Sequence, residues 1–195
     1  GLRHIVITCV DRDDLPDGGA QIWADTIESV HLAAPNTTVE ALIGDLQGEF
    51  ADLATIIASK PEILAHNLET VPRMQKAVRP QAMYDRSMQV LKNISESGLV
   101  CKTGIMVGIG EKDSEILTML ADIRDKTDTE IITIGQYLQP SRNHLPIDRW
   151  VHPDQFEMYK DEGLKLGFRV VESGPLVRSS FHAEEQVADY HSQQA

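Results

Sequence analysis

Residues 11–19 carry side chains that could hold a charged ligand. The segment contains four aspartates, one arginine and the glycine pair Gly18 and Gly19. Crowded carboxylates repel one another unless they bind cationic groups, and glycines let the backbone approach a ligand closely. The same composition is also typical of a solvated turn. The segment is therefore either a binding loop or an exposed connection.

Asn67 and Glu69 form a second candidate. They alternate along a stretch that we expect to be extended, so their side chains point the same way. A carboxylate beside an amide suits the vicinal hydroxyls of a ribose. Two polar residues at this spacing also occur along an exposed strand edge, so the pattern alone leaves both interpretations open.

Several common kinds of site are not indicated. Residues 104–111 place three glycines before Glu111, but they lack the lysine and hydroxyl residue of a phosphate-binding loop and the dinucleotide-binding fingerprint. The seven histidines show no zinc-binding spacing. The chain also has no Gly-x-Ser-x-Gly motif. These observations argue against a zinc hydrolase and an ordinary serine hydrolase.

Six short apolar runs, each ending in a polar or glycine-bearing segment, alternate with stretches of helical period. We expect strands within residues 5–10, 39–43, 63–65, 104–109, 131–134 and 170–171. We expect helices over residues 20–34, 48–59, 83–94, 113–123 and 153–164. This alternation predicts a parallel sheet, open or rolled into a barrel. Ligands of such sheets bind at the carboxyl ends of the strands, where the six polar endings would meet.

The bulk composition is typical of one acidic domain. The formal net charge of -12 argues against a surface for nucleic acid or an anionic membrane. No apolar run approaches the roughly 18 residues of a membrane helix, and no signal peptide begins the chain. We expect both cysteines, Cys9 and Cys101, to be buried in a reducing compartment. The predicted location is cytoplasmic, or mitochondrial or plastid in a eukaryote.

Four long motifs, read in order, resemble those of lipoyl synthases. They lie at residues 11–19, 66–73, 135–146 and 174–183, and the resemblance extends from Leu2 to Ala183. It implies an α/β fold, a partial (β/α) barrel of the radical S-adenosylmethionine type that lacks the first strand–helix unit. We expect this domain to span residues 1–187, followed by a polar tail at 188–195.

The resemblance also implies an activity. Lipoyl synthases are sulfurtransferases that insert two sulfur atoms into a protein-bound octanoyl group. They use S-adenosylmethionine and two 4Fe-4S clusters: one cluster generates 5'-deoxyadenosyl radicals, and the auxiliary cluster is consumed as the sulfur donor. The implied protein substrates are octanoylated lipoyl carrier domains, found in 2-oxoacid dehydrogenase acyltransferases and the glycine cleavage H protein. The implied electron donor is a ferredoxin or flavodoxin.

Site roles follow from the resemblance, position by position. The S-adenosylmethionine amino group is expected near Asp13, Gly18 and Gly19, its ribose near Asn67 and Glu69, and its carboxylate near Lys102. Arg142 and Arg178 are expected to hold anions of the substrate or cluster, and Ser180 to be a ligand of the auxiliary cluster.

The chain departs from the family pattern in two respects. The cysteine triplets that hold the clusters are absent, because in the family they lie upstream of the position of Gly1. Phe181 replaces the tyrosine that usually follows the serines. We therefore expect a piece of a longer protein, inactive by itself. Two alternatives remain open: a cluster-less remnant that only binds a carrier domain, and a non-radical barrel lyase that uses Lys102 or the acidic loop.

Overall fold

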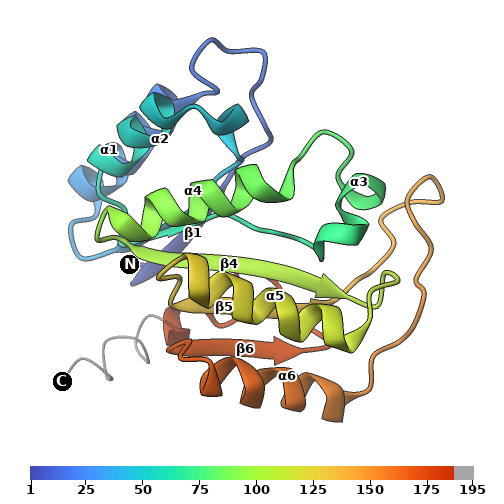
Figure 1. The fold of residues 1–195 in the computed structure, drawn as a ribbon. Coiled ribbons are helices and arrows are strands. Elements are labelled where there is room, and N and C mark those ends of the chain that lie inside the picture. The colour runs from blue at the N-terminus through green and yellow to red at the C-terminus, as the bar shows by residue number, and fades with distance from the viewer. Residues whose placement is uncertain (187–195) are drawn as a thin grey trace.

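Six parallel strands form one twisted sheet in the computed structural model, which describes residues 1–186 (Figure 1). The strand order β1-β2-β3-β4-β5-β6 follows the chain. The strands are β1 (His4–Thr8), β2 (Thr38–Leu42), β3 (Ile63–Ala65), β4 (Val100–Val107), β5 (Ile131–Gln136) and β6 (Val170–Gly174). Because every pair is parallel, all six carboxyl ends lie at one edge, as the sequence predicts.

Helices connect the strands and cover the outer face of the sheet (Figure 1). The main helices are α1 (Ala20–Ala33), α2 (Phe50–Ala58), α4 (Tyr84–Glu96), α5 (Asp113–Lys126) and α6 (Pro153–Lys165). These five confirm the predicted helices. The structure adds three short elements that the apolar pattern does not reveal, η1 (Leu46–Gly48), η2 (Pro72–Met74) and α3 (Gln75–Val78).

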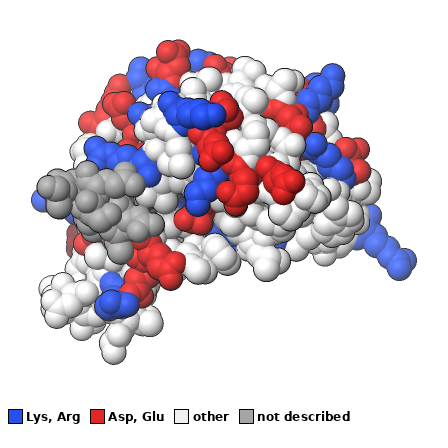
Figure 2. Space-filling view, turned by 90° about the horizontal axis from the view of Figure 1, so that it is seen from below, with Lys and Arg blue, Asp and Glu red and all other residues white. Residues whose placement is uncertain are grey.

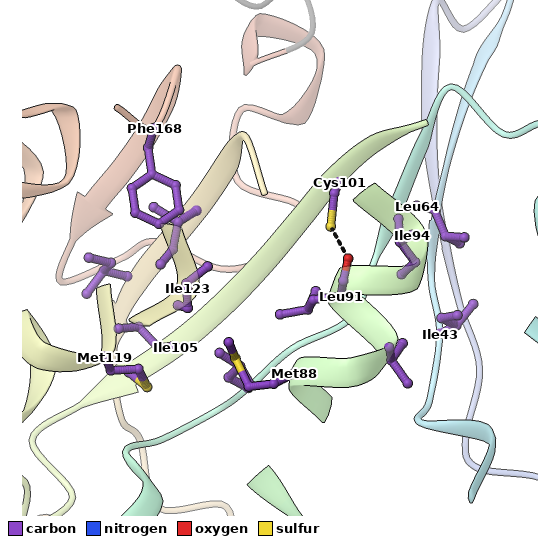
Figure 3. Packing of buried hydrophobic residues seen from close by; sticks show 14 of the residues in the cluster. Ile43, Leu64, Met88, Leu91, Ile94, Cys101, Ile105, Met119, Ile123 and Phe168 are labelled. Carbon is purple, nitrogen blue, oxygen red and sulfur yellow. Dashed lines mark hydrogen bonds between the residues drawn. The ribbon is translucent and has the colours of Figure 1, made fainter. Parts of the chain in front are cut away.

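The hydrophobic core lies between the sheet and these helices (Figure 3). Leu91 and Ile94 of α4 are fully buried beside Cys101 of β4. The Cys101 thiol donates to the Leu91 carbonyl at 3.5 Å, and burial raises the pKa of Cys101 to about 12. Cys101 therefore packs as a small apolar residue rather than a reactive thiol. Cys9 is exposed, so the expectation that both thiols are buried is wrong for Cys9, which follows the end of β1.

The opposite, inner face of the sheet has a different character. Towards the amino ends of the strands it carries a small apolar cluster of Ile63, Ile131, Val170 and Val100. Closer to the carboxyl ends, the inner face carries a buried Glu40–Lys102 ion pair and the glycines Gly104 and Gly135. Residues 177–179 lie against this face. No helix within residues 1–186 has the length and apolar character of a membrane span. The predicted tail at 188–195 lies outside the described residues.

His66, just after β3, is a buried structural histidine. Its Nδ1 lies 3.0 Å from the carbonyl of Ile43, and its Nε2 lies 2.9 Å from Oγ of Ser87. A neutral ring satisfies both contacts when Nδ1–H donates and Nε2 accepts. Burial lowers the pKa of His66 to about 4, because the charged imidazolium would lose its hydration.

We predict that His66→Gln flattens the acid side of the stability profile. The unfolded chain binds this proton near pH 6.5 and the folded chain only near pH 4. The resulting penalty on folding is absent above pH 6.5 and grows as the pH falls towards 4, where it reaches on the order of 3 kcal/mol. Urea unfolding across this range should show a smaller loss of unfolding free energy in the variant. The exposed His144→Gln is the control, and an equal loss in both variants would contradict the assignment.

Candidate functional site

A cavity of about 180 Å³ opens on the inner face near the carboxyl ends of β3, β4 and β5. We call it the inner cavity. Both predicted ribose-binding residues, Asn67 and Glu69, line it. Arg178 and Ser179 also line it, and they belong to the described residues that follow β6, 175–186, which we call the C-terminal segment. The remaining lining comes from Gly104, Ile105, Met106, Thr133, Gly135, Gln136, Leu138 and Val177.

Asn67 and Glu69 reach the cavity by a backbone path that differs from the predicted extended stretch. Glu69 has a left-handed backbone with φ of 65°. Its amide donates to the Gly104 carbonyl at 3.0 Å, and its carbonyl accepts from the Met106 amide at 2.8 Å. The segment therefore docks onto β4 beyond the end of β3, and both side chains still line one cavity.

The surroundings of Glu69 shift the pKa of its carboxyl group in opposing directions. Burial raises its pKa, while contact with Asn67 and the positive charge of Arg79 lower it. The Arg79 guanidinium also donates to the Asn67 carbonyl at 3.0 Å. Arg79 therefore fixes the segment that presents both polar side chains. Sequence reasoning assigned it no role, and it lies outside the four motifs that carry the resemblance.

Glycines keep the inner cavity open. A Cβ atom on Gly104 would lie 2.7 Å from Oδ1 of Asn67 and 2.8 Å from Oγ1 of Thr133. A Cβ atom on Gly135 would lie 2.3 Å from the carbonyl oxygen of Val177. Such contacts are too short for real atoms. Larger residues at these positions would displace the polar groups that face the cavity.

A wider groove of about 720 Å³ adjoins the inner cavity and shares Glu69, Met106 and Leu138 with it. Its walls are residues 77–80 and the loop after β5, including residues 143–146. Arg142 lies exposed on the same loop beside the groove lining. The groove gives the inner cavity a broad approach at the carboxyl edge of the sheet.

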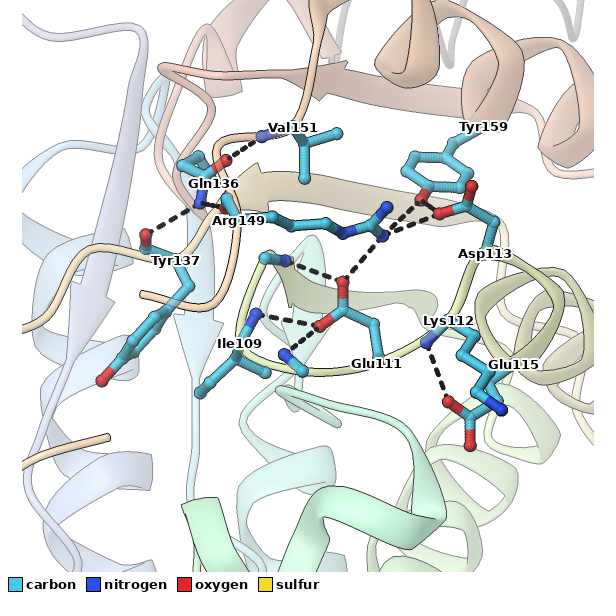
Figure 4. A network of polar contacts seen from close by, with 12 residues as sticks. Ile109, Glu111, Lys112, Asp113, Glu115, Gln136, Tyr137, Arg149, Val151 and Tyr159 are labelled. Atoms are coloured by element: carbon cyan, nitrogen blue, oxygen red, sulfur yellow. Dashed lines mark hydrogen bonds and ion pairs between the residues drawn. The ribbon is translucent and has the colours of Figure 1, made fainter. Parts of the chain in front are cut away.

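A polar network holds the loop after β5 in place (Figure 4). The Glu111 carboxylate accepts from the amides of Gly108, Ile109 and Gly110 at 2.7, 2.9 and 3.2 Å. Arg149 donates to Glu111 at 3.1 Å and to Asp113 at 2.7 Å. These glycine-segment amides are occupied within the protein, so they do not form a phosphate-binding nest. Nothing in the sequence pattern singled out Arg149.

The acidic loop lies apart from the inner cavity. Asp13 lines a separate depression with Asp11, Asp45 and Arg86, and this depression shares only Arg79 and Pro80 with the groove. Asp17 accepts from the amides of Gly19 and Gln21, both at 3.0 Å, and thereby satisfies an amide in the first turn of α1, whose N-cap residue is Gly19. These contacts lower the pKa of Asp17. Gly18 and Gly19 therefore form the turn into α1, and neither lines the inner cavity.

Lys102 is buried beneath the inner cavity, with 1% of its side chain exposed. Its Nζ lies 2.8 Å from Oε1 of Glu40 and donates to the carbonyl of Ser179 at 2.8 Å. Burial lowers the pKa of Lys102, and Glu40 opposes that shift. An amine enclosed by these partners has no access to a carbonyl substrate, which argues against the form of the lyase alternative that uses Lys102. Sequence reasoning missed Glu40 as the partner of Lys102. The available signal was that Glu40 is the one carboxylate within an otherwise apolar strand.

Ser180 faces a different opening from its neighbour Ser179. It is exposed beside Arg3, His4 and Val6, near the amino end of β1. The structure therefore brings Asn67, Glu69 and Arg178 together at the inner cavity, whereas Ser180 lines a separate opening. Within residues 1–186, no group of three or more His, Cys, Asp or Glu residues could hold a metal ion.

Comparison with known proteins identifies strong relatives. The chain is 50% identical over 187 residues to "Lipoyl synthase, mitochondrial" of Nematostella vectensis, covering 95% of this chain and 64% of that protein. It is 52% identical over 186 residues to "Lipoyl synthase" of Treponema denticola, with the same coverage of 95% and 64%. The predicted resemblance is confirmed. The chain spans about two thirds or less of the length of these relatives.

Solved structures with low sequence identity share the fold. A domain of pyruvate-formate lyase-activating enzyme from Bacteroides vulgatus has a TM-score of 0.62 at 11% identity, covering 86% of this chain and 98% of that one. Methylornithine synthase has a TM-score of 0.63 at 14% identity, covering 91% of this chain and 59% of that one. The Radical SAM superfamily matches residues 1–123, more than half of the sequence. Together with the parallel strands and helices described above, this match shows that the chain belongs to the Radical SAM superfamily.

Proposed function

We propose that the complete protein is a lipoyl synthase, which inserts two sulfur atoms into an octanoyl group carried on a protein. The observation that carries this proposal is the identity of about half of all aligned residues to proteins of that name, over 95% of this chain. The inner cavity supports it, because residues from the matching motifs meet there.

We propose that the inner cavity binds the nucleoside part of S-adenosylmethionine. The Glu69 carboxylate and the Asn67 amide would bind the ribose hydroxyls. Gly104 and Gly135 leave room for the ligand, because a Cβ atom at either position would collide with neighbouring polar atoms. When bound, S-adenosylmethionine supplies the radical chemistry of the superfamily. Arg178, at the rim of the cavity, and Arg142, on the adjoining loop, are the proposed anion-binding residues.

The cofactor amino and carboxylate groups need further partners. Asp13 lies near Arg79 on the same side of the sheet edge, so we keep it as a candidate for the amino group. Lys102 already contacts Glu40 and Ser179, which makes Arg79 a better candidate than Lys102 for the carboxylate. Gly18 and Gly19 would act by shaping the acidic loop.

We further propose that octanoylated lipoyl carrier domains are the protein substrates and that a small ferredoxin or flavodoxin supplies electrons. The net charge of -12 would repel an acidic carrier unless basic groups are placed locally. The face that carries α6 shows acidic and basic side chains interspersed, without one continuous basic surface (Figure 2). We therefore propose that the carrier docks at the wide groove beside Arg79 and Arg142, at the carboxyl edge of the sheet.

The direct test is product formation by the complete protein with S-adenosylmethionine, a reductant and an octanoylated carrier. We expect a lipoyl group on the carrier together with released 5'-deoxyadenosine, detected by mass spectrometry. A carrier modified without S-adenosylmethionine would support the lyase alternative. Carrier binding with no turnover, in a protein that contains its full iron and sulfide, would support the binding-module alternative.

We predict that Glu69→Ala weakens S-adenosylmethionine binding by roughly tenfold or more, because the ribose loses a charged hydrogen-bond partner worth about 1.5–3 kcal/mol. Isothermal titration of the complete protein measures the affinity, and iron content should not change. Glu28→Ala, an exposed position on α1, is the matched control. An affinity equal to that of the control would remove Glu69 from the proposed site.

We predict that Ser180→Ala separates the two products. In the complete protein, release of 5'-deoxyadenosine should continue while lipoyl product falls by at least tenfold, because Ser180 lies away from the inner cavity and near the other opening. Ser114→Ala, exposed at the start of α5, should leave both products unchanged. A parallel loss of both products in Ser180→Ala would contradict the separate role of this serine.

A further inference from the structure

The buried Glu40–Lys102 pair joins three distant parts of the chain. Glu40 lies on β2 and Lys102 on β4, with β3 between them. Their side chains are 0% and 1% exposed, and Nζ lies 2.8 and 2.9 Å from the two carboxylate oxygens. The same Nζ donates to the backbone carbonyl of Ser179 at 2.8 Å. The C-terminal segment is thereby tied to the middle of the sheet.

The segment also makes a second close contact with the inner face. It is at Gly135 of β5, where the Val177 carbonyl lies so close that a Cβ atom on residue 135 would be 2.3 Å from its oxygen. Between these points, residues 177–179 line the inner cavity, and Ser180 emerges at the opposite opening. The segment therefore crosses the inner face from the inner cavity to the amino end of β1. Arg3 pairs with Glu184 at that end.

Stability alone does not account for a charged pair at this position. A buried ion pair loses the hydration of both groups, and apolar residues of similar size often replace one without loss of stability. A backbone carbonyl as third partner adds a specific function: it selects one position of the segment. His4 extends the arrangement, with Nε2 3.8 Å from Oε2 of Glu40, so the strand next to the Ser180 opening is also in contact with the pair.

We propose that the Glu40–Lys102 pair is a positioning device, which holds the Ser179 carbonyl and thereby sets where Arg178 and Ser180 lie. Arg178 is directed to the inner cavity and Ser180 to the other opening, because the residue between them is fixed. The consequence for catalysis rests on the proposed lipoyl synthase function, whereas the anchoring itself does not. Lys102 and Glu40 are positioning residues that act through the segment.

The test uses the double variant Glu40→Leu with Lys102→Met in the complete protein. The urea unfolding midpoint should stay the same or rise, because apolar side chains replace both charges. Amide hydrogen exchange within residues 178–183 should accelerate at least tenfold, while exchange within β5 stays unchanged. The exposed pair on α5, replaced as Asp122→Leu with Lys126→Met, is the matched control and should not alter exchange in the segment.

Gly135→Ala provides an independent variant that leaves the ion pair intact. Its new Cβ would lie 2.3 Å from the Val177 carbonyl and displace the segment, so residues 178–183 should again exchange faster. Unchanged exchange of the segment in the double variant would overturn the proposal, whatever its activity and whatever the result for Gly135→Ala. Faster exchange accompanied by a lower ratio of lipoyl product to 5'-deoxyadenosine would support the full proposal. Absence of lipoyl product from the unaltered complete protein would instead refute the proposed function and leave the anchoring result standing.

Discussion

Neutralising one ammonium inside the sheet is the constraint on which this structure depends. Lys102 projects from a strand buried on both sides, where an unpaired charge would be prohibitively costly. Glu40 neutralises it from β2, and the Ser179 carbonyl accepts its remaining hydrogen bond. The C-terminal segment is consequently part of the inner face rather than a loose extension. That placement divides the inner face into a cavity on one side and an opening on the other.

The inner cavity exists because backbone replaces side chain at two neighbouring strands. Gly104 and Gly135 leave space that any Cβ would fill, and Asn67 and Glu69 face that space from the segment after β3. Glu69 reaches it through a left-handed backbone, a conformation that costs a non-glycine residue energy. Two hydrogen bonds with β4 offset this strain: the Glu69 amide donates to the Gly104 carbonyl, and the Glu69 carbonyl accepts from the Met106 amide. The polar pair is thus held by the sheet, which is suitable for a preorganised binding site.

Hydrogen bonds and ion pairs of Glu111 and Arg149 also fix the loops beside the inner cavity. Glu111 gathers three backbone amides at the end of β4, and Arg149 links that carboxylate to Asp113 and to the loop after β5. Gln136 accepts from the Val151 amide and donates to the Arg149 carbonyl, closing the same loop from its other end. The wall of the wide groove is therefore fixed on two sides without a helix. Such rigidity favours a groove that receives a partner in a defined orientation.

The sequence by itself determined the alternation of strands and helices. Contacts between residues far apart in the chain determined how the polar side chains of the site are arranged. Apolar runs and helical periodicity located all six strands and the five main helices, because both signals arise between residues close in the chain. Motif order pointed to the family, and the pairing of Asn67 with Glu69 was visible as a spacing. The sequence did not reveal three other features: the partner of Lys102, the occupied amides of the glycine segment, and the separation of Ser180 from the inner cavity. Each depends on which distant strands and loops come into contact, and only tertiary packing decides which buried group neutralises which charge.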